Sequence, residues 1–462
     1  MPRKNVEGIE MKKKMLALML AGTMMVALIA GCGSKSDADN DTASETEKGQ
    51  ENQASDSDKP FAGQSITFTD TGAGDWEEYI KPIIAKFEEE TGATVTMELY
   101  AHTDYLEMLD VKLGAGSSDY DVIGVDVPLV ASYASKDFIT PVDEYFSDDE
   151  KAIFTESALT AGSWDGEFYS PAMNSSSQLL WYNTALLKEA GVEVPESDTE
   201  NRLTWEQVEG IAKEALAVVD ADGNKGISGI AFEQVSRTYQ MNMLPNSMGG
   251  ANIGDDGFTV DGIINSEEWI NACTWYQNLY SNGISLKGLT ADDTGDIFKA
   301  GKIVFMVAGT WTAEALEKEG MSDYDYAPVP AFEGYEDKVG TPTGSWHFGI
   351  PKNSENKELA AEFIKYMSIG EGNTLWLETH GDVPSTTTGV ENILKSDTAE
   401  KYMKIAAYEA ANTAVPRALT PGYNEYDSVI ESTWDDIKNG ADVKESLDGA
   451  VKQLESLLSK LK

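Results

Sequence analysis

The chain has 462 residues, 41% of them hydrophobic, and a formal net charge of −44 at pH 7. This length exceeds what a single hydrophobic core usually organises, so two globular lobes are expected. The charge excludes nucleic acid as a partner, because 79 acidic residues against 35 basic ones would repel a phosphate backbone. We interpret the acidity as a solvated surface, and a cationic ligand such as a polyamine or a peptide remains the alternative.

The amino terminus has the pattern of a bacterial export signal. Three lysines at 12–14 precede an uncharged apolar run at 15–30, which is short for a membrane-spanning helix. The run ends in LIAGC (28–32), which resembles the lipobox of bacterial lipoproteins. The resemblance implies that Cys32 carries fatty acyl chains such as palmitate and becomes the first mature residue. An ordinary cleaved signal, or a membrane anchor with a chance cysteine, is the alternative.

Residues 1–31 are therefore expected to be a signal peptide, with Met11 as the true start. Segment 33–60 contains no aromatic residue and no Val, Ile or Leu, so it cannot bury enough apolar surface to fold. We expect residues 32–60 to form a lipidated cysteine followed by a disordered acidic tether. These features predict a soluble body held at the extracellular face of the bacterial cell membrane by a lipid anchor.

From residue 61 onward, strand and helix patterns alternate. Segments 65–69, 93–99 and 119–125 have strand composition, and the last is apolar enough to be buried on both faces. Between them, helical spacing places Ile80, Ile83, Ile84 and Phe87 on one face, and a second helix is expected over 105–113. This β-α-β-α-β order predicts a mostly parallel sheet covered by helices.

Local signals mark the ends of the first of these helices. Asp75 and Glu78 have the spacing of a capping box at its start, and Gly92 stands just past its end. Pro82 within the segment is expected to bend the helix or to move its start further along the chain.

A second alternating block covers about residues 175–310, and the last third of the chain adds further elements. Strand patterns occur at 178–183, 226–232, 302–308 and 347–350, and helical patterns at 184–190, 203–218, 357–367 and 441–461. Cys273 falls at helical spacing among aromatic residues, so we expect it to be a buried apolar residue.

Sequence motifs for catalysis and metal binding are missing. The chain has no G-x-S-x-G, H-E-x-x-H or C-x-x-C pattern, and its three histidines, His102, His347 and His380, are not paired at metal-ligand spacing. The S-x-x-K match at 354–357 is better interpreted as Ser354 capping the helix that follows. We expect no enzyme activity, no cofactor and no metal, although a glycosidase carboxylate pair remains open among so many acids.

Two glycine-containing loops match ligand sites only in part. GAGDWE (72–77) follows a strand and opens a helix, but Glu77 replaces the third glycine of a dinucleotide loop. A close approach of backbone N–H groups remains, which suits hydroxyls or anions. DADGNKG (220–226) begins like a calcium loop, but Ala231 stands at the twelfth position where glutamate is needed. We favour a tight turn there over a calcium site.

Three tryptophans lie beside glycines in expected loops: Trp76, Trp311 and Trp346. A neighbouring glycine leaves one face of the indole uncovered, and the apolar C–H face of a sugar ring packs well on such a surface. The alternative is that these indoles belong to the core. His347, which follows Trp346 directly, is expected to be a structural neighbour of this surface rather than a reagent.

Several segments together resemble the family 1, or sugar-binding, extracellular solute-binding proteins of bacterial ABC transporters. The resemblance runs from residue 61 to the C-terminus and rests on YDVIGVDVPLVASYASKDFITPVDEYF (120–146), GEFYSPAMNSSSQLLWYNTALLKEAGVEVP (166–195), TWEQVEGIAKEA (204–215), FKAGKIVFMVAGTW (298–311), TGSWHFGIPKNSENKELAAEFIKYM (343–367) and VPRALTPGYNEYDSVI (415–430). It implies a two-lobe α/β type II periplasmic-binding fold, with mostly parallel sheets flanked by helices and a ligand cleft between the lobes. Such proteins capture a solute by lobe closure and deliver it to a membrane permease.

The resemblance also implies ligand-binding residues. Asp126 matches an acid that accepts hydrogen bonds from sugar hydroxyls, and Arg417 matches a basic residue that reaches those hydroxyls. Trp311 and Trp346 match stacking aromatics, and Gly344 matches a glycine whose backbone approaches the ligand.

Four further positions belong to the expected site. Asn174 and Ser175 lie in the segment that crosses between the lobes, where NSSSQ departs from the tyrosine or aspartate common in the family. Trp76 falls near a ligand-facing polar position of the family, and Tyr423 belongs to its proline-glycine-tyrosine turn.

The sequence thus predicts a monomeric, lipid-anchored protein that binds a di- or oligosaccharide and delivers it to the permease of an ABC importer. A polyamine-binding protein is the first alternative, and a secreted glycosidase is the second. Lobe 1 is expected to contain residues 61–172 plus about 312–370, and lobe 2 about 175–310 plus 371–462.

Overall fold

The computed structural model describes residues 59–72, 76–344 and 346–462 of the chain. All of them belong to the unit Ser55–Lys462. The expected signal peptide and Cys32 lie outside the described residues, and so does the expected tether up to residue 58.

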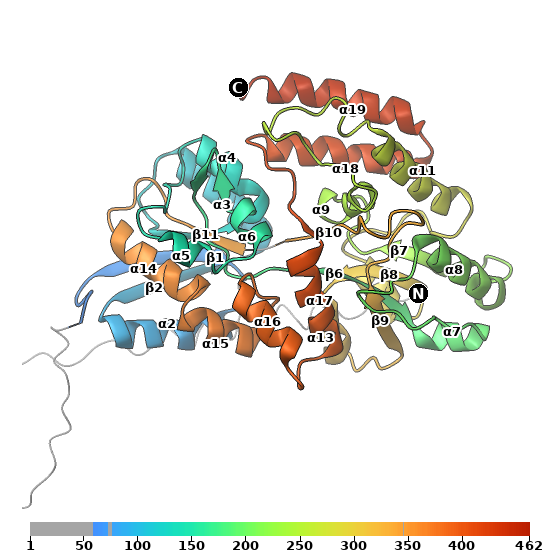
Figure 1. Ribbon diagram of the computed structural model, residues 1–462, viewed down its shortest axis with the longest axis horizontal. Coiled ribbons are helices and arrows are strands. Elements are labelled where there is room, and N and C mark those ends of the chain that lie inside the picture. Colours follow the sequence, from blue (N-terminus) through green and yellow to red (C-terminus); the bar gives the residue numbers. More distant parts are fainter. Residues whose placement is uncertain (1–58, 73–75, 345) are drawn as a thin grey trace, which may run out of the picture. The chain divides into compact units, whose positions relative to one another are not determined.

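The first sheet is built as the strand and helix order predicts. Its four strands are β1 (Ser65–Thr71), β2 (Thr94–Tyr100), β3 (Val122–Asp126) and β11 (Trp346–Gly349), arranged in the order β11-β3-β1-β2. β1 pairs parallel with both β2 and β3, through the crossover helices α2 (Glu77–Thr91) and α3 (His102–Gly114). β11 comes from a distant part of the chain and pairs antiparallel with β3. Figure 1 shows helices on both sides of this sheet.

Each face of the first sheet has its own core. Ile80, Ile83 and Phe87 of α2 pack with residues of α14 (Lys357–Ser368) against one face. Tyr105 and Leu109 of α3 pack with α4 (Val130–Ser135) in the core of the other face. α15 (Glu371–His380) packs against both α2 and α14, as Figure 1 shows, so it belongs with the first sheet and not with the second lobe as expected.

The first helix begins where its acidic residues favour it. Glu77 and Glu78 occupy the first turn of α2, where carboxylates interact favourably with the helix dipole. The helix starts before Pro82, so the expectation of a later start was wrong. At its other end, Gly92 stops the helix with a φ of 75°, as expected. Asp75, the other half of the expected capping box, lies outside the described residues.

The cap of α14 corrects another prediction. The N-cap residue is Asn356 and not Ser354. Ser354 instead donates from Oγ to Asp121 Oδ1 over 2.6 Å and accepts from the backbone N–H of Asn356 over 3.1 Å. Its hydroxyl therefore joins the segment before α14 to Asp121, the residue just before β3, which agrees with a structural role.

The second sheet is mixed, which corrects the expectation of mostly parallel strands for this lobe. Its order is β7 (Ser228–Phe232), β8 (Ile303–Gly309), β6 (Gln178–Asn183) and β9 (Tyr324–Pro328). β7 and β8 are parallel, but β6 is antiparallel to both β8 and β9. β6 runs antiparallel because the chain enters it from the first lobe. Its first residue, Gln178, therefore pairs with Gly309 at the end of β8. β9 therefore belongs to the second sheet, although residues from about 312 were expected in lobe 1.

Helices cover the second sheet on both sides. α7 (Thr184–Ala190) ends at Gly191, whose φ is 70°, and α8 (Trp205–Val219) packs Trp205 and Val208 into the core. α11 (Glu267–Ser281) carries Cys273, which is buried as expected. α18 (Tyr423–Asn439) and α19 (Val443–Leu458) pack side by side, as Figure 1 shows.

The remaining elements are short or connect the lobes. They are η2 (Val127–Leu129), α5 (Asp148–Lys151), α6 (Glu156–Ala161), β4 (Ser163–Trp164), β5 (Glu167–Phe168), α9 (Thr238–Met241), α10 (Met243–Asn246), α12 (Thr294–Lys299), α13 (Thr312–Lys318), β10 (Thr341–Pro342), α16 (Thr387–Lys395), α17 (Lys401–Asn412) and β12 (Ala414–Val415). β10 and β12 pair in parallel where the chain passes between the two sheets, so two crossing segments support each other there.

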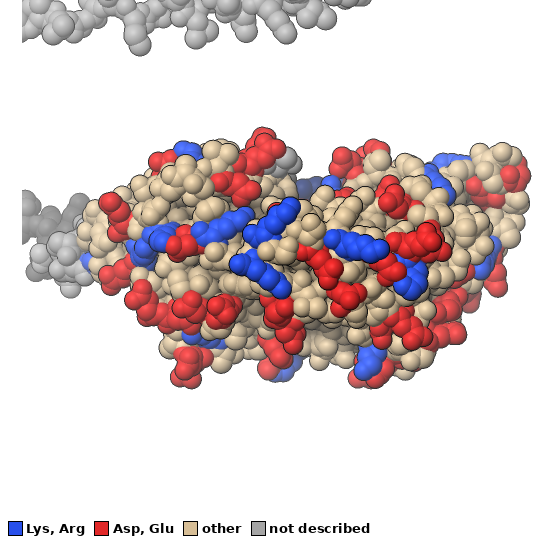
Figure 2. Space-filling view, turned by 90° about the horizontal axis from the view of Figure 1, so that it is seen from above, with Lys and Arg blue, Asp and Glu red and all other residues tan. Residues whose placement is uncertain are grey.

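Acidic side chains are interspersed with basic ones on part of the surface. Figure 2 shows one face, on which acidic side chains surround Lys and Arg side chains that run across its middle. This distribution agrees with the interpretation of the acidity as surface solvation.

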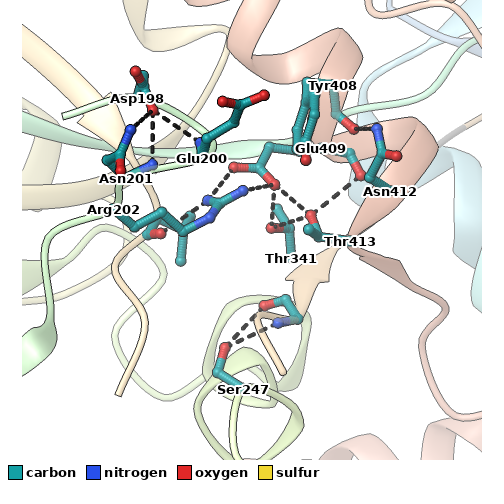
Figure 3. A network of polar contacts seen from close by, with 12 residues as sticks. Asp198, Glu200, Asn201, Arg202, Ser247, Thr341, Tyr408, Glu409, Asn412 and Thr413 are labelled. Carbon is teal, nitrogen blue, oxygen red and sulfur yellow. Dashed lines mark hydrogen bonds and ion pairs between the residues drawn. The ribbon is translucent and has the colours of Figure 1, made fainter. Parts of the chain in front are cut away.

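A buried ion pair supports the crossing segments (Figure 3). Arg202 Nη1 contacts Glu409 Oε1 at 2.5 Å, Nη2 contacts Oε2 at 3.0 Å, and Nη1 also donates to the carbonyl of Val329 over 3.1 Å. Glu409 lies on α17 and its side chain is fully buried, while that of Arg202 is 7% exposed. The hydroxyls of Thr341 and Thr413 also donate to Glu409. Both carboxylate oxygens and both Nη atoms of the pair are thus hydrogen-bonded, as a buried charge pair requires.

A second buried carboxyl, that of Asp70 on β1, predicts a pH-dependent stability. Its Oδ1 accepts from the N–H of Thr71 over 2.7 Å, but its Oδ2 has no hydrogen-bond partner among the described residues. Burial raises the pKa of Asp70 well above its usual value. The folded state therefore holds this proton more tightly than the unfolded state. The stabilisation of the folded state that comes from this bound proton is fully present below the unfolded pKa of about 3.9. It is lost as the pH rises through the folded pKa of Asp70.

We expect Asp70→Asn to flatten the dependence of unfolding free energy on pH above about pH 4, by up to about 1.4 kcal/mol per pH unit. The asparagine oxygen can still accept from Thr71, and no proton is lost. Urea unfolding of both proteins at a series of pH values measures the two slopes. Equal slopes would contradict the assignment of a protonated Asp70 to the folded state.

Candidate functional site

A cavity of about 520 Å³ lies where the two sheets and the crossing segments meet. Its position outside the ends of the strands β3 and β8 is the usual place for ligand binding in α/β sheets. It is lined by Trp76, His102, Asp126, Asn174, Ser175, Ser176, Gln234, Arg237, Tyr239, Thr310, Trp311, Glu314, Gly344, Trp346, His380, Gly381, Asp382, Tyr402 and Arg417.

The structure brings together all the residues expected in the site except Tyr423. Tyr423 begins α18 and is buried beside the cavity, in a small gap of about 10 Å³. Its hydroxyl lies 3.3 Å from Thr238 Oγ1 and 3.4 Å from Asp427 Oδ1. Tyr423 therefore packs behind the wall of the cavity, because the turn before it points its ring into the core.

On the side of the first sheet, indole rings form the wall. Trp346, at the start of β11, is half-buried, and its backbone N–H donates to Asn174 Oδ1 over 3.0 Å. The ring of Trp76 meets Trp346 at 6.2 Å with an interplanar angle of 90°. A Cβ at Gly72 would lie 2.6 Å from the ring of Trp76, so only glycine fits at that position. Glycine thus allows the indole to lie against the backbone.

On the side of the second sheet, Trp311 forms an exposed platform. It is 41% exposed, which is unusual for an indole. A Cβ at Gly309 would lie 2.1 Å from its ring, so the ring lies flat against the backbone of this glycine. Trp311 Nε1 donates to Glu233 Oε1 over 2.9 Å, which fixes the orientation of the ring. Burial raises the pKa of Glu233, and the bond from Trp311 opposes that shift.

The centre of the cavity holds an ion pair and not a free carboxylate. Arg417 Nη2 lies 3.2 Å from Asp126 Oδ1, and Nη1 lies 3.4 Å from Oδ2. The guanidinium lies over the ring of Tyr239 with 4.6 Å to its centroid. Burial alone would lower the pKa of Arg417, but Asp126, Tyr423 and Tyr239 together outweigh it and hold the pKa above its ordinary value. The guanidinium of Arg417 therefore stays charged and is paired with the carboxyl group of Asp126.

Backbone and hydroxyl groups of the crossing segments complete the floor. The N–H of Gly344 donates to Ser176 Oγ over 2.9 Å, and Ser176 Oγ lies 2.8 Å from the hydroxyl of Tyr239. A Cβ at Gly344 would lie 2.8 Å from the ring of Tyr239, so the packing of the backbone against this ring requires glycine. Ser175 Oγ lies 3.0 Å from Thr343 Oγ1 and is therefore already hydrogen-bonded.

His347 lies away from the cavity, as its alternation along the strand predicts. It is fully buried, and its Nδ1 lies 2.6 Å from the carbonyl oxygen of Ser170. Burial lowers the pKa of His347 to about 4, so its ring is neutral at physiological pH. His102 and His380, which sequence reasoning set aside, do line the cavity. His102 begins α3 and His380 ends α15. This position at a helix end beside the cavity is the sequence feature that could have identified them.

Residues 220–226 form the expected tight turn. The carboxylate of Asp220 accepts from the backbone N–H groups of Ile227 over 3.0 Å and of Lys225 over 2.8 Å. These bonds lower the pKa of Asp220. In the part of the chain that the structure describes, no group of three or more His, Cys, Asp or Glu side chains is placed to hold a metal ion. In that same part, no helix combines the length and apolar character needed to cross a bilayer.

The family model of the bacterial extracellular solute-binding proteins matches residues 82–407. The chain belongs to this family. It is 25% identical over 239 residues to the sn-glycerol-3-phosphate-binding periplasmic protein UgpB of Brucella melitensis, covering 51% of this chain and 53% of that protein. The corresponding protein of Rhizobium meliloti is 24% identical over 239 residues, covering 51% and 54%. The chain spans about half the length of these curated relatives.

Solved structures of solute-binding proteins share the fold. The GacH receptor of Streptomyces glaucescens has a TM-score of 0.68 and 22% identity, with 86% of this chain and 98% of that chain covered. The maltose-binding protein MalE of Listeria monocytogenes has a TM-score of 0.70 and 20% identity, with 86% and 98% covered. A cyclo/maltodextrin-binding protein complexed with maltotetraose has a TM-score of 0.71 and 19% identity, with 86% and 98% covered. The two-lobe α/β fold expected for the family is confirmed.

Proposed function

We propose that this solute-binding protein captures a di- or oligosaccharide in the cavity by closure of its lobes and delivers it to the permease of an ABC importer. The observation that carries the proposal is the pair of indole walls, with Trp76 and Trp346 on one side and the exposed Trp311 on the other. Sugar rings have apolar C–H faces that pack on indoles, while their hydroxyls need hydrogen-bond partners. Structures with the same fold contain maltose, maltotetraose and acarbose, which supports a sugar ligand.

The central ion pair favours an uncharged ligand. At the centre of the cavity a polyamine would need a carboxylate without a partner, and there Asp126 is paired with Arg417 at 3.2 Å. A phosphate, as in the ligand that names the UgpB relatives, would find Arg417 already engaged by Asp126. Arg237, which also lines the cavity, donates to Gln234 Oε1 over 3.3 Å, so the thermal-shift panel includes sn-glycerol 3-phosphate. The central pair of Arg417 and Asp126 therefore offers an unpaired charge to neither of these two charged ligands.

Binding without turnover is part of the proposal. The family consists of solute-binding proteins, and the cavity wall carries its aromatic and polar groups in hydrogen-bonded positions suited to holding a ligand. A secreted glycosidase would release reducing ends from an oligosaccharide. Reducing-sugar assays over the same panel of oligosaccharides distinguish the two functions.

A thermal-shift panel tests the function. The panel contains maltose, maltotetraose and other neutral oligosaccharides, spermidine, and sn-glycerol 3-phosphate. Only a ligand that binds the folded state raises the melting temperature, and at a concentration of 100 times Kd the stabilisation is about 2.7 kcal/mol. We expect a neutral sugar to raise it. A shift with spermidine or sn-glycerol 3-phosphate alone would refute the sugar proposal.

We further propose that the protein is a monomeric lipoprotein, anchored through Cys32 to the outer face of the cell membrane. The support is the lipobox-like LIAGC at 28–32 and the polar segment 33–60, whose root-mean-square reach would be on the order of 30 Å. We expect Cys32→Ala to abolish labelling with a radioactive fatty acid and to move the protein out of the membrane fraction. Cys273→Ala is the control that removes the buried cysteine and keeps the label. Unchanged fractionation of Cys32→Ala would rule out the anchor.

A further inference from the structure

Asp382 stands at the edge of the cavity in a fixed position that sequence reasoning did not identify. It follows α15 after Gly381, which ends the helix with a φ of 81°. Its Oδ2 accepts from Asn174 Nδ2 over 2.5 Å and from Trp376 Nε1 over 2.8 Å. Trp376 is fully buried in the core of the first sheet. One oxygen of the carboxylate is therefore held by a core residue and by a crossing segment together.

The other oxygen of Asp382 is left available. The side chain is 22% exposed, and Oδ1 lies 3.1 Å from Nδ1 of His380. Nδ1 of His380 nevertheless has no aligned hydrogen bond among the described residues, so this contact does not satisfy Oδ1. Because Oδ2 is bonded by Trp376 and Asn174, Oδ1 is the oxygen of this cavity-lining side chain that remains for a ligand.

Aromatic rings hold this oxygen next to the indole wall. The ring of His380 stacks on Trp376 with centroids 4.2 Å apart and an interplanar angle of 16°. The ring of Trp76 meets His380 at 5.9 Å and Trp376 at 5.1 Å. A sugar ring that packs against Trp76 would therefore present its edge, where the hydroxyls lie, to Asp382 and His380.

We propose that Asp382 is a specificity-determining residue, whose Oδ1 accepts a hydrogen bond from a hydroxyl of the sugar ring bound at Trp76. The inference rests on the sugar-binding function proposed above. A fixed carboxylate oxygen is a strong acceptor for a hydroxyl and repels an anionic group. This end of the cavity therefore favours a ring with a free hydroxyl over a ring that carries an anionic group. Asn174 bonds both Asp382 and the backbone of Trp346, so it positions the acceptor and the wall together.

Asp382→Asn tests this role with little change of shape. The asparagine oxygen takes the place of Oδ2 and keeps the bonds from Asn174 and Trp376, while its amide places a donor where Oδ1 accepts. The matched control is Asp397→Asn, the same substitution at an exposed position outside the cavity lining. Both variants are titrated calorimetrically with the neutral sugar that gives the largest thermal shift on the wild type.

We expect Asp382→Asn to weaken sugar binding by about 10- to 100-fold, and Asp397→Asn to leave it within twofold. Deoxy analogues of the same sugar then separate recognition from structure. For the analogue lacking the recognised hydroxyl, wild type and Asp382→Asn should bind equally. An affinity within twofold of wild type would overturn the role of Asp382 and leave the proposed function standing. An equal loss of affinity for every analogue would also overturn the role of Asp382. If the wild type bound no sugar, the role of Asp382 and the proposed function would both be overturned.

Discussion

Replacing Glu409 by alanine is expected to lower the free energy of unfolding by about 3 to 5 kcal/mol. Arg202 is 7% exposed and gives two hydrogen bonds to this carboxylate. Removing the acid would leave a guanidinium in the interior without a counter-charge. Thr341 and Thr413, which also donate to Glu409, would lose their acceptor. The loss of stability therefore comes from leaving a buried charge and its neighbouring hydroxyls without partners. It exceeds the net contribution of the ion pair to the free energy of unfolding.

A double variant separates these two quantities. Arg202→Met combined with Glu409→Leu removes both charges and fills similar volume, so most of the lost stability should return. The surface pair of Lys395 and Glu391 is the control, because its side chains are 74% and 63% exposed. Glu391→Ala should leave the urea midpoint unchanged. If Glu409→Ala and Glu391→Ala were equally mild, the network of Figure 3 would not stabilise the crossing segments.

Trp311→Ala is expected to weaken sugar binding by about 2 kcal/mol or more, which is roughly 30-fold in Kd. The indole is 41% exposed in the cavity, lies on the backbone of Gly309, and is fixed through Glu233. It therefore offers a large preformed apolar face that loses little side-chain entropy on binding. Because the ring is exposed, its removal leaves no hole in the core, and the melting temperature without ligand should stay nearly constant.

Two controls accompany this variant. Trp311→Phe keeps a ring but loses area and the bond to Glu233, so its affinity should lie between those of wild type and Trp311→Ala. Leu394→Ala removes another exposed apolar side chain, 38% exposed and outside the cavity lining, and should not change affinity. Titration calorimetry of all three gives the ranking. Trp311→Ala binding as tightly as Leu394→Ala would remove Trp311 from the site.

Much of the fold could be predicted because local signals and tertiary structure agree. The apolar spacing of Ile80, Ile83 and Phe87 produces a helix that buries that face, and Gly92 and Gly191 end their helices in the left-handed conformation. The crossover order of β1, β2 and β3 follows from the handed, parallel connections of β-α-β units.

The orientation of the second sheet could not be predicted in the same way. β6 is antiparallel to its neighbours because it enters from the other lobe, and strand composition does not reveal the direction of entry. β9 and α15 were assigned to the wrong lobes for a related reason. Each follows an element of one lobe along the chain, and only its pairing or packing partner shows where it belongs.

Some residues of the candidate site could likewise be predicted from the sequence, and others could not. Trp76, Trp311 and Trp346 could be selected because glycine beside an indole signals an uncovered ring, and the structure places all three around the cavity. Asp382 and Tyr239 could not, because each depends on contacts between residues far apart in the chain. Tyr423 was included from a turn motif alone, and the turn directs its ring into the core.

Titration calorimetry of the protein with neutral oligosaccharides, maltotetraose among them, tests the central claim most directly. We expect saturable binding of one oligosaccharide per chain, at micromolar or lower Kd, with the sugar recovered intact after incubation. Binding of spermidine or sn-glycerol 3-phosphate with no heat from any neutral sugar, or the release of reducing ends from the bound oligosaccharide, would contradict it.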